Sequence, residues 1–191
     1  MAVRPIRLLG DPILRARSEA VKRVKSPAVR VVADDLQDTL RDLKERQGHG
    51  RGLAAPQIGA PLRILYIEKD EPWFLLNPEI VDIGDDDFLV WDDCFSIPDL
   101  LVRVQRAHRV TVQYTDLSGK QQTVNAEGDV AELLQHEIDH LDGVLMVDRP
   151  CGLDPFCLRA EWEKHYAADG PYSEPTSRYM ITGEHPIPTP T

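Results

Sequence analysis

Gln135-His136-Glu137-Ile138-Asp139-His140 is the stretch that decides how the rest of this 191-residue chain is interpreted. On a helix, residues four apart lie on the same face, so His136 and His140 can present two imidazoles to one metal ion. Glu137 lies about 100° round the helix from His136. From there its carboxylate can take a proton from a water beside the metal. The pattern therefore predicts a hydrolytic metal site carried on a helix.

The sequence around this motif supports a helix over residues 129–142. Asp129 is a candidate N-cap, and Glu132 stands three residues later, as in a capping box. Gly143 occupies the C′ position, where a helix commonly ends. The apolar residues recur with helical spacing and predict a buried stripe that carries the histidines inward: Val130, Leu133, Leu134, Ile138 and Leu141.

Composition narrows the class of protein. The chain is 42% hydrophobic and 28% charged, as in soluble globular domains, and its net charge of −10 argues against a general affinity for nucleic acid. No apolar run approaches the length that crosses a membrane. Three cysteines form no even disulfide framework and suit a reducing cytoplasm. We expect one catalytic domain over residues 1–168 and a proline-rich, extended or disordered tail over 169–191.

The order of predicted elements indicates an α+β domain. Ser26 and Pro27 begin a helix that runs to about residue 47 and ends at Gly48. Strand-like runs follow at 63–68, 73–76, 88–91 and 102–104, and 109–115 with 121–125 reads as a hairpin. After the metal helix, Asp154 and Pro155 begin a last helix to about residue 168. Strands grouped between helices predict α+β rather than an alternating parallel sheet.

Two histidines leave a catalytic metal site one protein ligand short. A third histidine at the metzincin spacing is excluded, because Met146 holds that position. A downstream helical glutamate, Glu161 or Glu163, lies at a permissible distance. The remaining option is a cysteine from elsewhere in the chain, and Cys94 stands between two strand-like segments.

Three segments together resemble the motifs of the peptide deformylase family. They are Gly50-Arg51-Gly52-Leu53-Ala54-Ala55-Pro56-Gln57, Asp92-Asp93-Cys94-Phe95-Ser96 and the stretch from Gln135 to His140, in the order and at separations similar to those of the family. The likeness runs from about Ile6 to Val147. Three ordered motifs are far more specific than one H-E-x-x-H.

The resemblance implies a fold, a reaction and a set of residues. Antiparallel strands would pack around the central metal-binding helix, with Cys94, His136 and His140 as ligands of one divalent ion. The family mostly uses ferrous iron, and the same ligands accept zinc, nickel or cobalt. Glu137 would act as general base, and the Gln57 amide with the backbone N–H of Phe95 would stabilise the oxyanion. The resemblance implies these substrate-binding residues: Gly50, Arg51, Gly52, Leu53, Asp92, Glu132 and Leu133.

The implied reaction is hydrolysis of the N-formyl group of formyl-methionine on nascent polypeptides, which releases formate. The partners are N-formylated peptides and nascent chains, with the ribosome as a further partner, and neither nucleic acid nor membrane. Three other functions stay open on the sequence: a zinc peptidase with Glu161 as third ligand, a hydrolase of a small formylated metabolite whose acidic group binds Arg51, and a diverged binding module.

Five residues depart from the family pattern. Arg51 and Glu132 replace apolar residues, Asp92 replaces Glu, Asp93 replaces Gly, and Phe95 replaces Leu. In the family the motif Glu pairs with an Arg, and Arg106 holds that place here. By the same analogy Arg51 and Glu132 approach the pocket for the first side chain of the substrate, so we expect an ion pair that weakens methionine selectivity. The alternative is that both side chains point into solvent.

Overall fold

Two antiparallel sheets enclose one helix in the computed structural model, which describes residues 2–68 and 71–171. The five-stranded sheet has the order β1-β2-β3-β6-β7, and the three-stranded sheet has the order β4-β5-β8. The first comprises β1 (Gly52–Ala54), β2 (Ile64–Glu68), β3 (Pro72–Ile83), β6 (Arg109–Thr115) and β7 (Gln121–Glu127). The second comprises β4 (Asp87–Cys94), β5 (Ile97–Ala107) and β8 (Phe156–Leu158). The predicted α+β class with antiparallel strands is confirmed.

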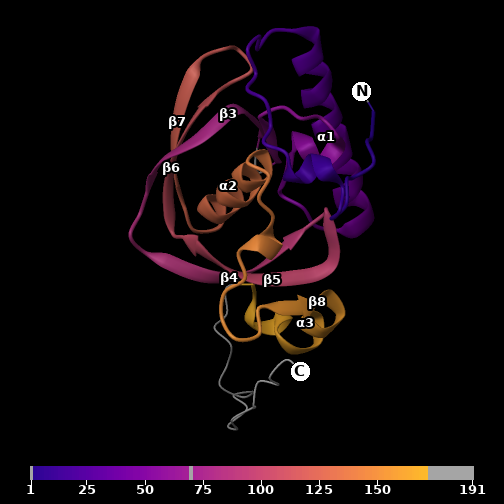
Figure 1. Cartoon of the computed structure of the whole chain (residues 1–191), viewed down its shortest axis with the longest axis vertical. Coiled ribbons are helices and arrows are strands. Elements are labelled where there is room, and N and C mark those ends of the chain that lie inside the picture. The colour runs from indigo at the N-terminus through magenta and orange to yellow at the C-terminus, as the bar shows by residue number, and fades with distance from the viewer. Residues whose placement is uncertain (1, 69–70, 172–191) are drawn as a thin grey trace, which may run out of the picture.

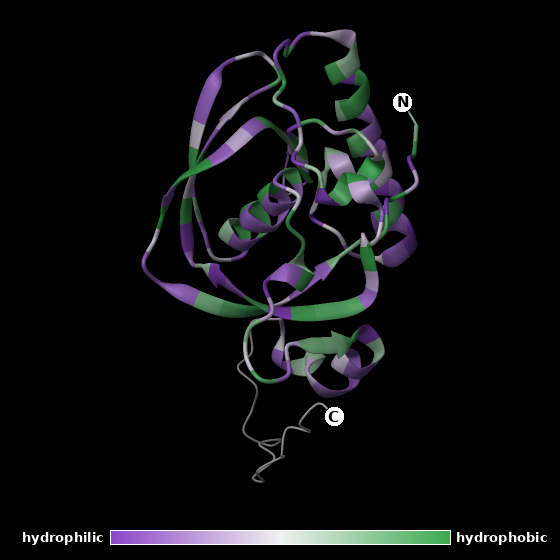
Figure 2. Ribbon diagram, in the orientation of Figure 1, coloured by the Kyte–Doolittle hydropathy of each residue, from purple (hydrophilic) through white to green (hydrophobic). Residues whose placement is uncertain are grey.

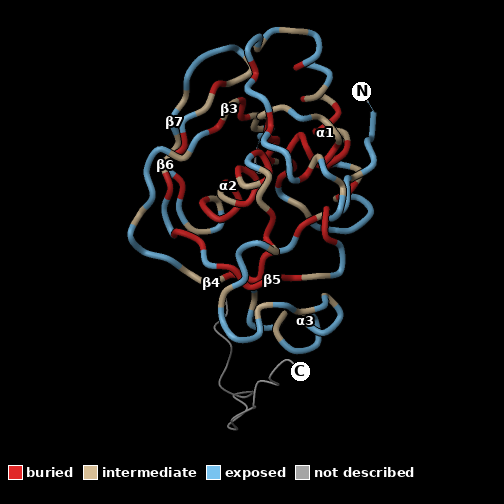
Figure 3. The backbone as a smooth tube through the Cα atoms, viewed as in Figure 1, coloured by how far each residue is buried: buried red, intermediate tan, exposed pale blue. Residues whose placement is uncertain are grey.

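Helix α2 (Gly128–Leu141) carries the H-E-x-x-H motif through the middle of the molecule. Figure 1 shows the strands wrapped around it, and its inner residues are green in Figure 2 and red in Figure 3, that is, hydrophobic and buried. Its apolar stripe packs in one core cluster with residues of β2, β3, β6 and β7. A helix buried on most sides presents its polar residues to protein rather than to water, so each of them needs a partner.

Helix α1 (Pro27–Gln47) begins and ends where the sequence predicts. The Ser26 hydroxyl accepts a hydrogen bond from the Val29 N–H, and Gly48 ends the helix in the left-handed conformation with φ 78°. Leu36 and Leu40 pack in a second core cluster that includes residues of β1 and β2. This packing places α1 against β1, which lies within the first of the three motifs.

The predicted capping box of α2 is wrong. The helix begins at Gly128, one residue earlier than predicted, and its N-cap Glu127 makes no side-chain capping bond. Asp129 therefore lies inside the first turn, where a carboxylate still interacts favourably with the helix dipole. Glu132 does not turn back to the backbone, because its side chain is bound to Arg51.

The predicted C-terminal helix begins too early. Residues Phe156–Leu158 form β8, which pairs with β5 in the register Leu100↔Leu158 to Val102↔Phe156, and only Arg159–His165 form helix α3. Pairing with a strand distant in sequence overrides the local helical pattern. The 3-10 helices are η1 (Pro12–Arg15), η2 (Ala55–Ile58), η3 (Met146–Asp148) and η4 (Ala167–Asp169). Strands β3 and β5 extend well beyond their predicted ranges.

The predicted tail over 169–191 falls almost entirely on residues 172–191, which lie outside the described part of the chain. Across residues 2–68 and 71–171, every helix is too short or too polar to cross a membrane.

Truncation of Leu134 tests whether α2 is the centre of the core. Leu134 has an exposed fraction of 0% within the cluster of α2. Replacing Leu134 by Ala leaves a cavity, so the free energy of unfolding should fall by about 2–5 kcal/mol. The matched control is Leu153→Ala, which makes the same change at a side chain with an exposed fraction of 99%. Urea denaturation measures both, and equal stabilities would contradict the burial of α2.

Candidate active site

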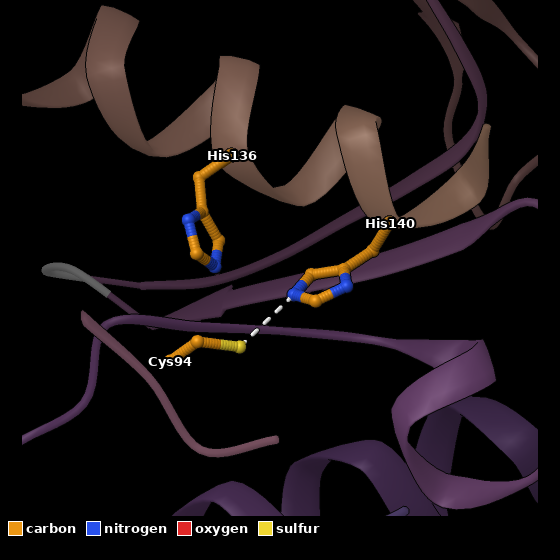
Figure 4. A group of neighbouring side chains, drawn as sticks. All are labelled: Cys94, His136 and His140. Carbon is orange, nitrogen blue, oxygen red and sulfur yellow. Dashed lines mark hydrogen bonds between the residues drawn. The ribbon is translucent and has the colours of Figure 1, made fainter. Parts of the chain in front are cut away.

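The three residues proposed as metal ligands meet in space although they come from distant parts of the chain. Cys94 ends β4, and His136 and His140 lie one turn apart on α2. One donor atom from each lies within 4.8 Å of the others, and all three residues are buried. Cys94 Sγ and His140 Nε2 are 3.2 Å apart. Figure 4 shows both imidazoles directed from α2 toward the thiol.

Asp92 fixes the orientation of His136. Its Oδ1 accepts a hydrogen bond from His136 Nδ1 at 2.8 Å, which leaves Nε2 free to face the cluster. Its Oδ2 accepts from Arg106 Nη2 at 2.9 Å, and Arg106 Nη1 donates to Asp139 at 2.6 Å. Burial alone would raise the pKa of Asp92, but His136 and Arg106 outweigh burial and lower the pKa to about 2. The predicted pair of Asp92 with Arg106 is confirmed.

These residues fit a first-row divalent ion. A thiolate and two imidazoles are the donor set that zinc, iron, nickel and cobalt accept. Burial lowers the pKa of His140 well below its ordinary value, which keeps this imidazole in the neutral form that a metal requires. A second group, Asp92 with Glu132 and His136, is also compact. Its Asp92 and Glu132 carboxylates are already paired with Arg106 and Arg51.

Glu137 lies beside the cluster, and Gly52 makes room for it. A Cβ at Gly52 would stand 2.6 Å from Glu137 Oε1, so a larger residue would force this carboxylate to shift. Burial raises the pKa of Glu137 to about 7. Its Oε2 is buried and has no hydrogen-bond partner among the described residues. A carboxylate with this pKa can both accept and return a proton near neutral pH.

Gln57 is held with its amide nitrogen toward the cluster. Its Oε1 accepts a hydrogen bond from the Ala54 N–H at 2.8 Å, and its Nε2 donates to Ser96 Oγ at 3.2 Å. The same Nε2 lies 3.5 Å from Cys94 Sγ. The ring of Phe95 stacks on His49, with 5.7 Å between the ring centroids. Ser96, the last residue of the second motif, thus holds the Gln57 amide in place, a contact that the motif alone did not predict.

A cavity of about 670 Å³ adjoins the cluster. It is lined by six of the seven residues predicted to bind substrate: Gly50, Arg51, Gly52, Asp92, Glu132 and Leu133. Leu53 instead lies wholly inside the core on β1 and is not among the residues that line the cavity, so its predicted place in substrate binding is wrong. Strand β1 is an edge strand of one sheet and β4 an edge strand of the other, which brings two strand edges to the cavity.

Arg51 and Glu132 form the predicted ion pair. Arg51 Nη2 is 2.5 Å from Glu132 Oε2, with exposed side-chain fractions of 46% and 4%. Arg51 Nη1 also donates to the Asp129 carbonyl oxygen at 3.1 Å. Burial and the nearby Asp92 raise the pKa of Glu132, and Arg51 opposes them. The alternative in which both side chains point into solvent is wrong.

Glu161, the rival third ligand, lies away from the cluster. It is on α3, where it pairs with Lys164 at 2.6 Å and His165 at 3.4 Å on the protein surface. Neither compact metal-binding group in the described residues includes it. Trp162 and Arg159, which were not predicted as site residues, line the cavity from the C-terminal segment. No motif or periodicity marks these two residues.

Comparisons with known proteins agree with this geometry. The family model for polypeptide deformylase matches residues 3–155. A peptide deformylase from Agrobacterium fabrum is 44% identical over 154 residues, covering 78% of this chain and 87% of the relative. The peptide deformylase structure from Thermotoga maritima is 31% identical with a TM-score of 0.73, covering 80% of this chain and 100% of that one. A Met-Ala-Ser-bound class I type b enzyme from Acinetobacter baumannii is 30% identical with a TM-score of 0.71, covering 78% and 98%. This chain belongs to the polypeptide deformylase family.

Proposed function

We propose that this enzyme removes the N-formyl group from the first residue of new polypeptides with a divalent ion held by Cys94, His136 and His140. The observation that carries the proposal is the meeting of these three buried donors within 4.8 Å, next to Glu137. We assign ferrous iron as the native ion, and zinc, nickel and cobalt as ions that the same ligands accept. The match to the deformylase family model over residues 3–155 supports the substrate class.

The residues around the ion divide the chemistry among them. When bound, the ion supplies Lewis acidity, which lowers the pKa of a water ligand and polarises a carbonyl. Glu137 accepts a proton from the attacking water and returns it to the departing amine. Gln57 Nε2 and the backbone N–H of Phe95 donate hydrogen bonds to the developing oxyanion. Water adds to the formyl carbon and the C–N bond breaks, giving formate and a free amino group.

The proposal extends to partners and location. We take N-formylated nascent chains as the substrate and the ribosome as the place where they are met. The Acinetobacter baumannii relative was solved with Met-Ala-Ser, a deformylated tripeptide, which supports a peptide rather than a small metabolite. A thiolate ligand favours a reducing cytoplasm. We assign residues 1–168 to the catalytic domain and treat the zinc-peptidase and binding-module functions as disfavoured.

The Arg51–Glu132 pair is proposed to weaken selection for methionine. Glu132 lies on α2 one residue from Leu133 and four from His136, and all three line the cavity. A methionine side chain gains little from contact with a buried carboxylate and its guanidinium partner, since apolar contact is what stabilises it. A polar or smaller first side chain loses less binding energy than methionine does, because it depends less on apolar contact. We therefore expect kcat/KM for formyl-methionine peptides to exceed that for other formyl peptides by less than it would with an apolar pocket wall.

Exchange of Cys94 separates the two candidate metal sites. Cys94→Ala should remove a ligand, so the purified protein should retain little metal and release no formate. Glu161→Gln alters an exposed surface pair and should leave metal content and turnover within about twofold of wild type. Elemental analysis of anaerobically prepared, iron-loaded protein measures the metal content of each variant, and formate release measures its turnover. Full metal retention by Cys94→Ala with loss in Glu161→Gln would favour the zinc-peptidase site.

Gly52→Ala tests the position of Glu137. The added methyl group would stand 2.6 Å from Glu137 Oε1 and would displace the general base. We expect kcat to fall by roughly 10²-fold or more, because positioned general bases contribute about 10²–10⁴-fold. Metal content should not change, since no ligand is touched. An unaltered kcat would show that Glu137 has room that the structure does not indicate.

Replacing the ion pair by apolar residues tests selectivity. The double variant Arg51→Val with Glu132→Leu removes both charges together, so no buried carboxylate is left unpaired. We expect the ratio of kcat/KM for formyl-Met-Ala-Ser to that for formyl-Ala-Ala-Ser to rise by roughly tenfold, within the range that apolar pockets achieve for added methylenes. Formate release is the assay. An unchanged ratio would mean that the first side chain does not contact this pair.

The single variant Arg51→Ala is the control for charge compensation. It leaves the Glu132 carboxylate buried without its partner, and since Arg51 is half-exposed the cost in stability should lie below the roughly 3–5 kcal/mol of a fully buried pair. A thermal or urea midpoint should therefore fall in the single variant and recover in the double variant.

A further inference from the structure

The C-terminal segment forms one wall of the catalytic cavity. Arg159 and Trp162 of α3, together with Pro171, line the same cavity of about 670 Å³ as Cys94 and His136. The deformylase family model ends at residue 155, so this wall lies outside the matched part of the chain. Figure 1 shows β8 and α3 beside β4 and β5, on the side away from α1.

Contacts from both ends of the segment hold the wall against β4 and β5. Strand β8 pairs with β5, and Arg159 Nη2 lies 2.7 Å from Asp93 Oδ2. The Trp91 N–H donates to the Pro171 carbonyl oxygen at 2.8 Å. The rings of Trp91 and Tyr166 also pack with 5.5 Å between their centroids. Residues 156–171 are therefore fixed at the cavity rather than resting loosely on the surface.

The wall brings apolar area close to the reaction centre. Trp162 lines the cavity together with Trp91 and Leu101 of the three-stranded sheet. The guanidinium of Arg159 is neutralised by Asp93, so the wall carries little net charge. Indole rings offer large contact areas at little conformational cost, which suits recognition of aromatic and long aliphatic side chains.

The volume of the cavity exceeds what the formylated residue needs. Pockets of roughly 300–1,000 Å³ enclose whole drug-sized ligands, and this cavity of about 670 Å³ falls within that range. Resting on the proposed deformylase function, we infer that Trp162 and the Arg159–Asp93 pair form a subsite for a residue that follows the formylated one. The subsite prefers an aromatic or long aliphatic side chain.

Three matched tripeptides test the subsite: formyl-X-Ala-Ala, formyl-X-Phe-Ala and formyl-X-Ala-Phe, where X is the first residue that the wild type hydrolyses best. We expect at least one phenylalanine peptide to exceed the alanine peptide in kcat/KM by roughly two- to tenfold, through a lower KM. Trp162→Ala should abolish this preference, measured as the ratio of kcat/KM for the phenylalanine peptide to that for the alanine peptide within the same variant. Trp162→Phe should retain most of the preference.

Lys164→Ala is the matched control, because Lys164 lies on the same short helix and pairs with the exposed Glu161. It should keep the preference. Asp93→Ala is the second test if Trp162→Ala does not fold: it releases Arg159 without touching the indole, and the preference should fall. Equal kcat/KM values for the three peptides in the wild type, or a preference that survives in Trp162→Ala, would overturn the inference.

The proposed function and the subsite can fail separately. If the wild type releases no formate from any peptide, the deformylase proposal fails. Calorimetric binding of the deformylated peptides Met-Ala-Ala, Met-Phe-Ala and Met-Ala-Phe then tests the subsite alone. Tighter binding of a phenylalanine peptide by the wild type, lost in Trp162→Ala, would support the subsite. Equal binding of the three peptides would overturn it.

Discussion

The buried carboxylate of Asp92 is the contact on which the active site depends. It lies between an imidazole of α2 and a guanidinium of β5, with hydrogen bonds of 2.8 Å to His136 and 2.9 Å to Arg106. This arrangement pairs three buried polar groups, each of which would cost several kcal/mol if it were left without a partner. His136, a proposed metal ligand, thereby acquires its orientation from the same contact that joins the helix to the three-stranded sheet.

Further polar contacts along α2 oppose rotation or sliding of the helix. Arg106 also binds Asp139, whose carboxylate accepts from Arg149 at 2.7 and 2.8 Å. Gln135 accepts from the Ala107 N–H and donates to its carbonyl oxygen, which ties the first residue of the motif to the end of β5. A rotation of the helix by one residue would break all of these bonds together. Precision at the metal site is therefore a product of polar contacts, while the apolar stripe supplies most of the stability.

The structural features that depend on local residue spacing, such as helix α2, were the ones best predicted from the sequence. The period of Leu134, Ile138 and Leu141 is enough to place α2 and to turn its histidines inward. Cys94 could be joined to them only through the resemblance of ordered motifs, because nothing local distinguishes a ligand from a buried thiol. The start of the last helix was misplaced since pairing of β8 with β5 is a contact between distant segments. Trp162 was missed for the same reason: its place at the cavity exists only once that pairing has formed.

Each charged departure from the family pattern is paired with an oppositely charged residue. Asp92 is paired with Arg106, Arg51 with Glu132, and Asp93 with Arg159. Each pair joins a motif residue to a different element, namely β5, α2 and α3. Asp92 and Glu132 are buried, so each of these carboxylates needs its partner, whereas the half-exposed Asp93 is solvated and its pair contributes less to stability. Restoring a single family residue at position 51 would therefore strand the buried Glu132 carboxylate. Restoring glycine at position 93 would remove one of the contacts that hold α3 at the cavity, while the pairing of β8 with β5 would remain.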